Sequence, residues 1–297
     1  MKKWIVAVAG SAAAFLGGAA LAADIPVKAP PAAAPVVTWT GGYLGTGIGA
    51  EWGSTRWTTT CFAQNDPSAV PDTGSCSNPS PIFGVIDNSS PYTFKTTSWR
   101  WTMYGGWNFQ AGSALVGLEV QFGVGAGSRR IPGIPGCILS PDACIGNGEA
   151  TQVRLDYDAN IRLRAGYLFT PQLLAYGTAG PAFQSFRTTV TCTPVSDVCQ
   201  NGDLAVSSSA HPTMFGWTAG GGLEWRYQQF IFRGEYRYSD YGNTNVSYFL
   251  PAGGGGNTAP SEAVGIHTRL HTTTQMAYFG ASYLWGPREG GAGREEQ

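Results

Sequence analysis

The stretch VRLDYDANIRLRAGYLF, residues 153–169, decides the fold class. Its odd-numbered residues, from Val153 to Phe169, are apolar or aromatic, whereas its even-numbered residues are charged or amide as far as Gly166. Alternate residues of a β-strand point to opposite sides, so this pattern predicts a strand with one apolar and one polar face. The predicted polar face carries Arg154, Asp156, Asp158, Asn160, Arg162 and Arg164.

The length of this segment favours a membrane strand over a strand of a soluble sandwich. Strands of globular proteins usually run about five or six residues, whereas a strand that crosses a bilayer at a tilt needs about 9–11 residues. The apolar face is therefore expected to contact lipid, and the polar face to line an interior. Tyr167 and Phe169 at one end fit the aromatic girdle of such barrels.

The composition agrees with a membrane barrel. Charged residues make up 12% of the chain, against about 25% in ordinary soluble proteins. The chain has 42 glycines among 297 residues, about twice the usual share. No apolar run beyond the N-terminal segment reaches the length of a transmembrane helix.

The first 22 residues have the features of a secretory signal peptide. Lys2 and Lys3 precede an uncharged run, and Ala20-Leu21-Ala22 is a small-residue cleavage site. The alternative, a membrane-anchoring helix, is disfavoured by the glycines in the run and by its Ala-x-Ala ending. Cleavage would leave 16 basic and 19 acidic residues, so no basic surface for nucleic acid is implied. Residues 23–38, rich in Pro and Ala, predict an extended periplasmic lead-in.

Alternation recurs along residues 39–285 and predicts an all-β fold, an eight-stranded antiparallel transmembrane β-barrel. The predicted strands are 42–57, 98–109, 116–124, 153–169, 173–190, 217–227, 230–238 and 277–285. Long connections, residues 58–97, 127–150, 192–212 and 243–267, alternate with very short ones, as in outer-membrane barrels with long outer loops and tight periplasmic turns. The phase of strand 173–190 is undefined, and its Pro181 predicts a bulge or irregularity.

The charged residues of the predicted strands fall on the inward face. An eight-stranded barrel is only just wide enough to be filled by side chains, so we expect these charges to pair and to plug the lumen, with at most a narrow ion leak. A small-solute pore is the alternative. The expected lumen network is Glu51, Arg100, Glu119, Arg154, Asp156, Asp158, Arg162, Arg164, Glu224, Arg226, Arg233, Glu235 and Arg237. The expected aromatic girdle is Trp107, Phe109, Tyr167, Phe169, Trp225, Tyr227, Tyr283 and Trp285.

The six cysteines fall as three pairs, one in each of the first three long connections. Fifteen connectivities are formally open, but this placement favours Cys61–Cys76, Cys137–Cys144 and Cys192–Cys199, which an oxidising exterior would allow. A metal site is the weaker alternative, because no pair has Cys-x-x-Cys spacing. We predict no metal and no cofactor.

Two further functions use the histidines. A lipid-modifying enzyme is one alternative, with Ser208 and Ser209 near His211, but no Gly-x-Ser-x-Gly motif is present, so we predict no enzyme. Haem binding at the outer loops is the other, with His211, His267 and Tyr248 as candidate axial ligands.

Four segments resemble one family: the signal peptide followed by ADIPVKAP (23–30), then WTGGYLGTGIGAEWG (39–53), RLRAGYLFTPQLLAYGTAG (162–180) and MAYFGASYLW (276–285). They are similar to the small outer-membrane barrels of the opacity-like porin family, which includes outer membrane immunogenic proteins. The resemblance implies a surface-exposed protein of a Gram-negative outer membrane, with a role in envelope integrity, passive permeation, adhesion or host recognition. Its implied partners are outer-membrane lipid, the barrel-insertion machinery and host or environmental surface ligands. The chain departs from the family in residues 286–297, a polar tail that we expect to be disordered.

Overall fold

The computed structural model describes residues 38–64, 86–137, 148–193, 205–249 and 264–286. Apart from Thr38 and Gly286, the segments predicted as signal peptide, lead-in and tail lie outside these ranges. Within the described residues, no helix is both long and apolar enough to cross a membrane. The described strands are β1 (Gly41–Gln64), β2 (Tyr92–Ala111), β3 (Ala114–Pro132), β4 (Ala150–Thr170), β5 (Leu173–Cys192), β6 (Val206–Ala210), β7 (Thr213–Tyr227), β8 (Phe230–Tyr248) and β9 (Val264–Trp285).

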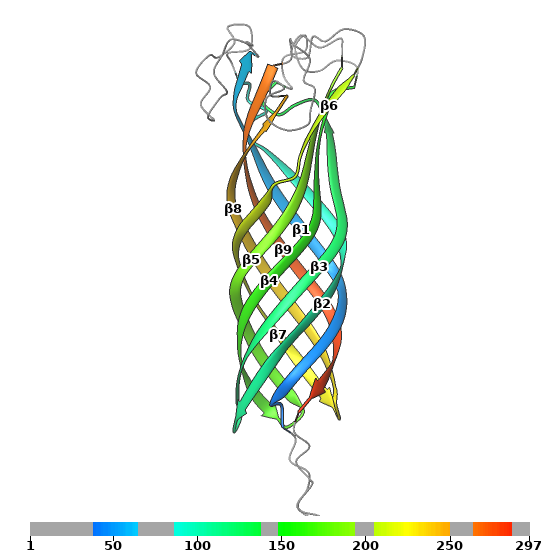
Figure 1. Ribbon diagram of the computed structural model, residues 1–297, viewed down its shortest axis with the longest axis vertical. Coiled ribbons are helices and arrows are strands. Elements are labelled where there is room, and N and C mark those ends of the chain that lie inside the picture. The colour runs from blue at the N-terminus through cyan, green and yellow to red at the C-terminus, as the bar shows by residue number, and fades with distance from the viewer. Residues whose placement is uncertain (1–37, 65–85, 138–147, 194–204, 250–263, 287–297) are drawn as a thin grey trace, which may run out of the picture. The chain divides into compact units, whose positions relative to one another are not determined.

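Eight of these strands close into an antiparallel barrel (Figure 1). β1 pairs with β2 on one side and with β9 on the other, and β5 pairs with both β4 and β7, so the ring is complete. The short β6 adds only to the far end of β5. The predicted eight-stranded barrel is therefore confirmed.

The connections at one end of the barrel are two-residue turns. They are Gly112-Ser113, Pro171-Gln172 and Gln228-Gln229. Gly112 has a φ of +61°, a left-handed conformation that glycine adopts without a steric penalty. The connections at the other end are long, so the predicted alternation of long and short connections is confirmed, and the long ones mark the outer side.

The outer wall is apolar along most of its length. Trp99, Leu163 and Phe279 are 75%, 70% and 79% exposed, which is incompatible with an aqueous surface over so large and continuous an area. The predicted outward faces of the first three strands are confirmed, because their large apolar side chains, such as Leu44, Trp107 and Leu118, are exposed and Ala50 is partly exposed.

Two aromatic girdles bound this apolar wall. The predicted girdle residues, all exposed near the two-residue turns, are Trp107, Phe109, Tyr167, Phe169, Trp225, Tyr227, Tyr283 and Trp285. A second girdle, which the sequence reading missed, contains Trp52, Trp99, Tyr157, Phe183, Phe215 and Trp217. Tyr157 lies ten residues from Tyr167 on β4, which is about 33 Å along the strand and about 25 Å along the axis of a barrel tilted by ~40°. This matches the height of a membrane-embedded band.

The strands continue beyond the second girdle as a wall that we call the outer sleeve, formed by the parts of β1–β5, β8 and β9 nearest the long connections together with β6. Several predicted loops were therefore too long: β1 continues to Gln64, β2 begins at Tyr92, and β3 reaches Pro132. The predicted loops 192–212 and 243–267 likewise contain β6, the end of β8 and the start of β9. These segments escaped detection because their apolar residues, such as Phe94, face inward and their polar ones face water.

The inward face of β4 differs from the prediction at its outer end. A β-bulge lies between Leu155 and Asp158 in the pairing of β4 with β5, and both of these residues are buried. An extra residue in one strand reverses its alternation, so Val153 and Leu155 face the interior. The prediction that Arg154 and Asp156 line the lumen is therefore wrong, because both lie on the outer face of the sleeve.

The phase of β5 is regular from end to end. Its even-numbered residues, from Leu174 to Val190, face inward and all but the intermediate Gly180 are buried. Pro181 faces outward and is paired with Trp217 without a register shift. On its other side the pairing with β4 is interrupted at Pro181, because the pairs pass from Asn160–Ala182 to Leu163–Ala179. The predicted irregularity is therefore present as a break in the β4–β5 ladder, without a bulge or a change of register.

Candidate functional site: a closed lumen

The lumen is closed at its periplasmic end by an apolar floor. Trp39 is fully buried there, donating from its backbone N to Gln110 Oε1 over 2.6 Å and from Nε1 to the Pro171 carbonyl oxygen over 3.0 Å. These bonds tie the residue to the β2 end and to the β4–β5 turn. The apolar side chains around Trp39 include Leu115, Leu168, Leu174, Ile231 and Leu284.

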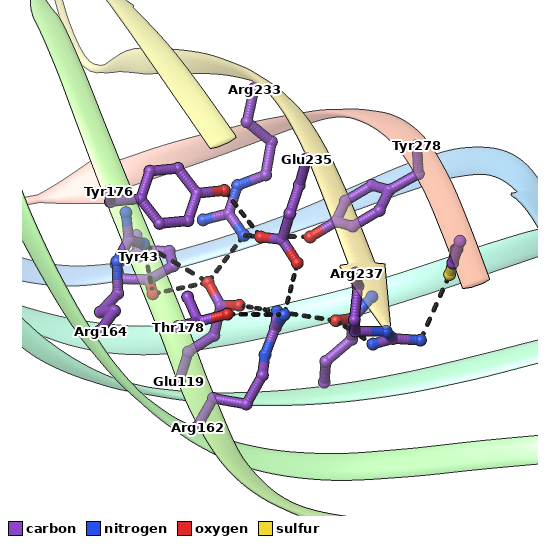
Figure 2. A network of polar contacts seen from close by, with 12 residues as sticks. Tyr43, Glu119, Arg162, Arg164, Tyr176, Thr178, Arg233, Glu235, Arg237 and Tyr278 are labelled. Carbon is purple, nitrogen blue, oxygen red and sulfur yellow. Dashed lines mark hydrogen bonds and ion pairs between the residues drawn. The ribbon is translucent and has the colours of Figure 1, made fainter. Parts of the chain in front are cut away.

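Above this floor, Glu119 on β3 binds three arginines (Figure 2). Its carboxylate oxygens lie 2.5 Å from Arg162, 2.7 Å from Arg233 and 3.4 Å from Arg164. All four side chains are fully excluded from solvent. Arg162 is the register partner of Glu119 on the adjacent β4, whereas Arg233 reaches it from β8 across the lumen.

Two further glutamates complete this cluster. Glu224 on β7 accepts from Arg164 over 2.8 Å and from Arg233 over 2.7 Å. Glu235 on β8 pairs with Arg162 and lies 3.7 Å from Arg233. Each arginine is thus shared between at least two carboxylates, so the bonds cross the lumen as well as joining neighbouring strands.

A second cluster lies nearer the outer side, around Asp158 on β4. Its carboxylate is 3.1 Å from Arg100 on β2 and 2.9 Å from Arg237 on β8. Arg100 also pairs with Glu51 on β1 over 3.1 Å. Gln121 joins the two clusters, because its Oε1 accepts from Arg162 over 2.8 Å and from Arg237 over 2.7 Å.

Buried tyrosines hold the arginines in place. The Tyr43 hydroxyl donates to Glu119 over 2.7 Å and accepts from Arg164, and the Tyr176 hydroxyl donates to Glu235 over 2.7 Å. The Arg233 guanidinium lies 3.9 Å from the ring centroid of Tyr104, a cation–π contact. With Tyr278 on β9, which accepts from Arg233, every one of the eight barrel strands contributes a side chain to the lumen network.

Inward glycines leave room for these rings. A Cβ atom at Gly106 would lie 2.7 Å from the Tyr43 hydroxyl, and one at Gly222 would lie 2.9 Å from the Tyr176 hydroxyl. A side chain at either position would displace the tyrosine that holds a carboxylate. The glycine-rich inward face thus provides close approach of side chains.

The outer sleeve is filled by apolar side chains, which we call the outer plug. Trp57 is fully buried and stacks on Tyr248 with ring centroids 5.4 Å apart and an interplanar angle of 14°. The remaining members, on six strands and the adjoining connections, are Phe94, Ile131, Ile134, Cys137, Val153, Val190, Cys192, Val246, Phe249, Ile266 and Leu270. The lumen therefore has an apolar closure at each end of its charge network.

The charges of this lumen network balance. Sequence reasoning expected seven basic and six acidic side chains, but Arg154 and Asp156 lie outside the barrel and Arg226 lies at the periplasmic rim. Arg226 donates to the carbonyl oxygens of Gln228 and Thr38. The network contains five arginines and five carboxylates: Arg100, Arg162, Arg164, Arg233 and Arg237 with Glu51, Glu119, Asp158, Glu224 and Glu235.

The candidate residues of the alternative functions lie at the outer end of the barrel, where several of them are buried or hydrogen-bonded to neighbouring strands. Tyr248 is fully buried, donates to Thr188 over 2.6 Å, and has a pKa raised by burial, which opposes the phenolate that binds haem iron. His267 is 6% exposed, whereas His211 is exposed at the break between β6 and β7. Ser208 is buried and accepts from the Phe249 backbone, and Ser209 contacts Thr189.

Three of the six cysteines are described, and each is in a disulfide. They are Cys61, Cys137 and Cys192, one at the margin of each of the first three long connections. Cys76, Cys144 and Cys199 lie outside the described residues. Pairing within each connection therefore stays a prediction.

Sequence reasoning found the charged residues of the lumen but missed its tyrosines and both apolar closures. Tyr43 and Tyr104 share the inward parity of Glu51 and Arg100 on their strands, and this parity was the available signal. The charged residues of β5 and β9 face outward, so they gave no such signal for Tyr176 and Tyr278. The outer plug had a weaker signal, because Trp57 and Phe94 have the parity opposite to the lipid-facing tryptophans on the same strands.

Comparison with known proteins identifies relatives of this closed barrel. No family model matches the chain. The 31 kDa outer-membrane immunogenic protein of Brucella melitensis is 27% identical over 253 residues, which cover 83% of this chain and 90% of the relative. The 25 kDa outer-membrane immunogenic protein of Brucella abortus is 27% identical over 236 residues, covering 79% and 80%. The chain is homologous to these outer-membrane immunogenic proteins.

This homology places the protein in the outer membrane of a Gram-negative bacterium, as the resemblance of the sequence implied. Solved barrels of low similarity were also found. Neisserial surface protein A has 10% identity and a TM-score of 0.35, covering 83% of this chain and 98% of that one. The outer membrane protease OmpT of Escherichia coli has 9% identity and a TM-score of 0.44, covering 82% and 97%.

Proposed function

We propose that this protein is a structural surface barrel of the outer membrane, which supports the envelope and presents its outer connections to the surroundings without forming a diffusion pore or catalysing a reaction. One observation carries the proposal: the five arginines and five carboxylates of the lumen are all buried and share their partners across the barrel axis. A water-filled channel would separate these charges.

The energetics support a closed state. Moving an ion from water into a protein interior costs several kcal/mol unless a partner compensates. Here each carboxylate has an arginine partner, and Glu119 has three. Opening a channel would break several of these pairs at once and would also require displacement of Trp39 or of the outer plug. The network therefore predicts no measurable ionic conductance, or only small and brief conductance steps, in place of a steady current.

Recording of single channels in planar bilayers tests this function. We expect the wild-type protein to be silent or to flicker, and Glu119→Ala to increase conductance, because three arginines lose their common partner. Asp156→Asn serves as the control, since it removes a carboxylate outside the barrel. Large steady conductance of the wild type would contradict the closed lumen. A Glu119→Ala variant as silent as the wild type would show that this pairing does not control permeation.

The remaining alternatives have direct tests of their own. Mixing purified protein with haemin should leave the Soret band unshifted, because the buried Tyr248 and His267 are not accessible to a large planar ligand. Mass spectrometry of lipid A from cells with and without the protein should show no modification. A Soret shift or a new lipid A species would favour the corresponding alternative over a structural barrel.

A further inference from the structure

Arginines gather on the outer face of the sleeve, where β3, β4 and β5 run side by side. Arg154 on β4 lies directly opposite Arg187 on β5. Arg130 on β3 is paired with Gln152, two residues before Arg154 on β4. Residues two apart on a strand share a face, so Arg130, Arg154 and Arg187 form a row across three strands, which we call the outer arginine row.

The outer arginine row does not stabilise the fold. Like charges directly opposite each other destabilise an antiparallel pair, and Arg154 and Arg187 are such a pair. Asp156 is the only described carboxylate in an ion pair with the row, at 3.0 Å from Arg154 and 3.9 Å from Arg187. The two arginines remain 45% and 49% exposed. The row therefore keeps a net positive charge that is accessible from outside the barrel.

The row lies at a defined depth. Arg154 is three residues beyond Tyr157, and Arg187 is four residues beyond Phe183, both of which belong to the outer aromatic girdle. At about 2.5 Å of axial rise per tilted residue, the two arginines lie roughly 8–10 Å above the apolar band. The headgroup region of a bilayer extends about 5–8 Å beyond the hydrocarbon boundary. The backbone of the two arginines is therefore at its outer edge, and their long side chains can reach into it.

We propose that the outer arginine row binds the phosphate of a phosphorylated lipid headgroup in the outer leaflet. Guanidinium groups present planar pairs of donors that match phosphate oxygens. Directly opposite residues on antiparallel strands have Cα atoms about 5 Å apart, so Arg154 and Arg187 can hold one phosphate between them. Arg130 then supplies a third positive charge from the same side. This site is on the outer wall and is independent of whether the lumen conducts.

The test uses the full chain refolded in detergent micelles and titrated with diphosphoryl lipid A, with bound lipid counted by native mass spectrometry. We expect the double variant Arg154→Gln/Arg187→Gln to bind at least tenfold more weakly than the wild type. The matched control is Arg56→Gln/Lys95→Gln, which removes two exposed charges from β1 and β2 on the same sleeve. The control should change binding less than threefold. Heat-modifiable migration on gels verifies that every variant is folded.

Three outcomes would overturn the proposal. Equal losses in both double variants would show that the general charge of the sleeve attracts the lipid. Unchanged binding in the arginine variant would remove the site altogether. Displacement of lipid A by an equal concentration of inorganic phosphate would make the ligand a free anion and not a lipid. Conversely, lipid A without phosphate groups should bind the wild type and the arginine variant equally weakly.

Discussion

Glu119 and Trp57 are both fully buried inside the same barrel, yet Glu119 is surrounded by arginines and Trp57 by aromatic and aliphatic side chains. The difference follows from what lies outside the wall at each height. Around Glu119 the outer face contacts lipid, so apolar residues occupy the outside and the polar residues of each strand must face inward. Around Trp57 the outer face contacts water, and the arrangement reverses.

Two mechanisms bring about this reversal along the strands. In β1 and β2 the sequence itself changes, because Trp52 and Trp99 face outward whereas Trp57 and Phe94 face inward. In β4 the alternation of the sequence is unbroken. The bulge between Leu155 and Asp158 instead turns the apolar residues of the strand from the outer face to the interior. β8 has a similar register shift between Asp240 and Asn243, beyond which Val246 and Tyr248 are buried.

The largest effect that we predict is in the lumen network. Glu119→Ala should lower the free energy of unfolding by about 3–5 kcal/mol, because removal of one partner leaves buried charges uncompensated. Equilibrium unfolding in urea, in detergent micelles, measures this change. Glu119→Gln keeps the size of the side chain and should lose nearly as much. A loss below 1 kcal/mol in both variants would mean that water enters the lumen and solvates the arginines.

Truncation of Trp57 tests whether the outer plug is energetically separate from the network. Trp57→Ala should destabilise the sleeve by about 3 kcal/mol, because a large cavity forms next to Tyr248. Hydrogen exchange should become faster in residues 53–61 and 266–274 and remain slow in the membrane-embedded band. Faster exchange throughout the barrel would show that both regions unfold as one unit.

The inward face within the membrane was predictable from sequence, and the sleeve was not. A strand between lipid and a polar lumen must alternate strictly, so the inward positions of Glu119, Arg162 and Glu235 follow from parity alone. Which arginine meets which carboxylate depends on the register between strands far apart in the sequence. The Arg233–Glu119 pair, 114 residues apart, is an example.

The bulge in β4 shows a different limit. Residues 153–160 alternate as regularly as the residues that follow them, so no local feature marks the change of face. The bulge arises because the neighbouring β5 keeps its phase from Leu174 to Val190 while the surroundings of the wall change from lipid to water. An environment that changes along the strand, and not the pattern of the strand, therefore placed Arg154 and Asp156 outside.

A pair of adjacent substitutions tests this reversed phase. Val153→Thr should cost about 1–2 kcal/mol, because a hydroxyl enters the apolar outer plug, whereas Arg154→Ala should cost no more than about 0.5 kcal/mol at the surface. Urea unfolding with a fluorophore attached to the sleeve measures both. The unbroken alternation of the sequence predicts the opposite order, with the arginine buried. If Arg154→Ala were the more damaging change, the bulge would be misplaced.

The smallest predicted loss of stability comes from breaking an ion pair at the surface, in contrast to the buried pairs of Glu119. Asp156 pairs with the half-exposed Arg154, and such surface pairs contribute at most about 1 kcal/mol. Asp156→Asn should therefore lower the free energy of unfolding by less than this amount, chiefly because Arg154 and Arg187 then face each other without a carboxylate.

Salt screens exposed charges over a Debye length of about 8 Å at physiological ionic strength, so raising the salt concentration should remove the difference between this variant and the wild type. The same salt should leave the loss caused by Glu119→Ala almost unchanged, because ions do not reach a fully buried carboxylate. Urea unfolding of both variants at low and high salt makes the comparison, and a salt-sensitive Glu119→Ala would show that the lumen is open to solvent.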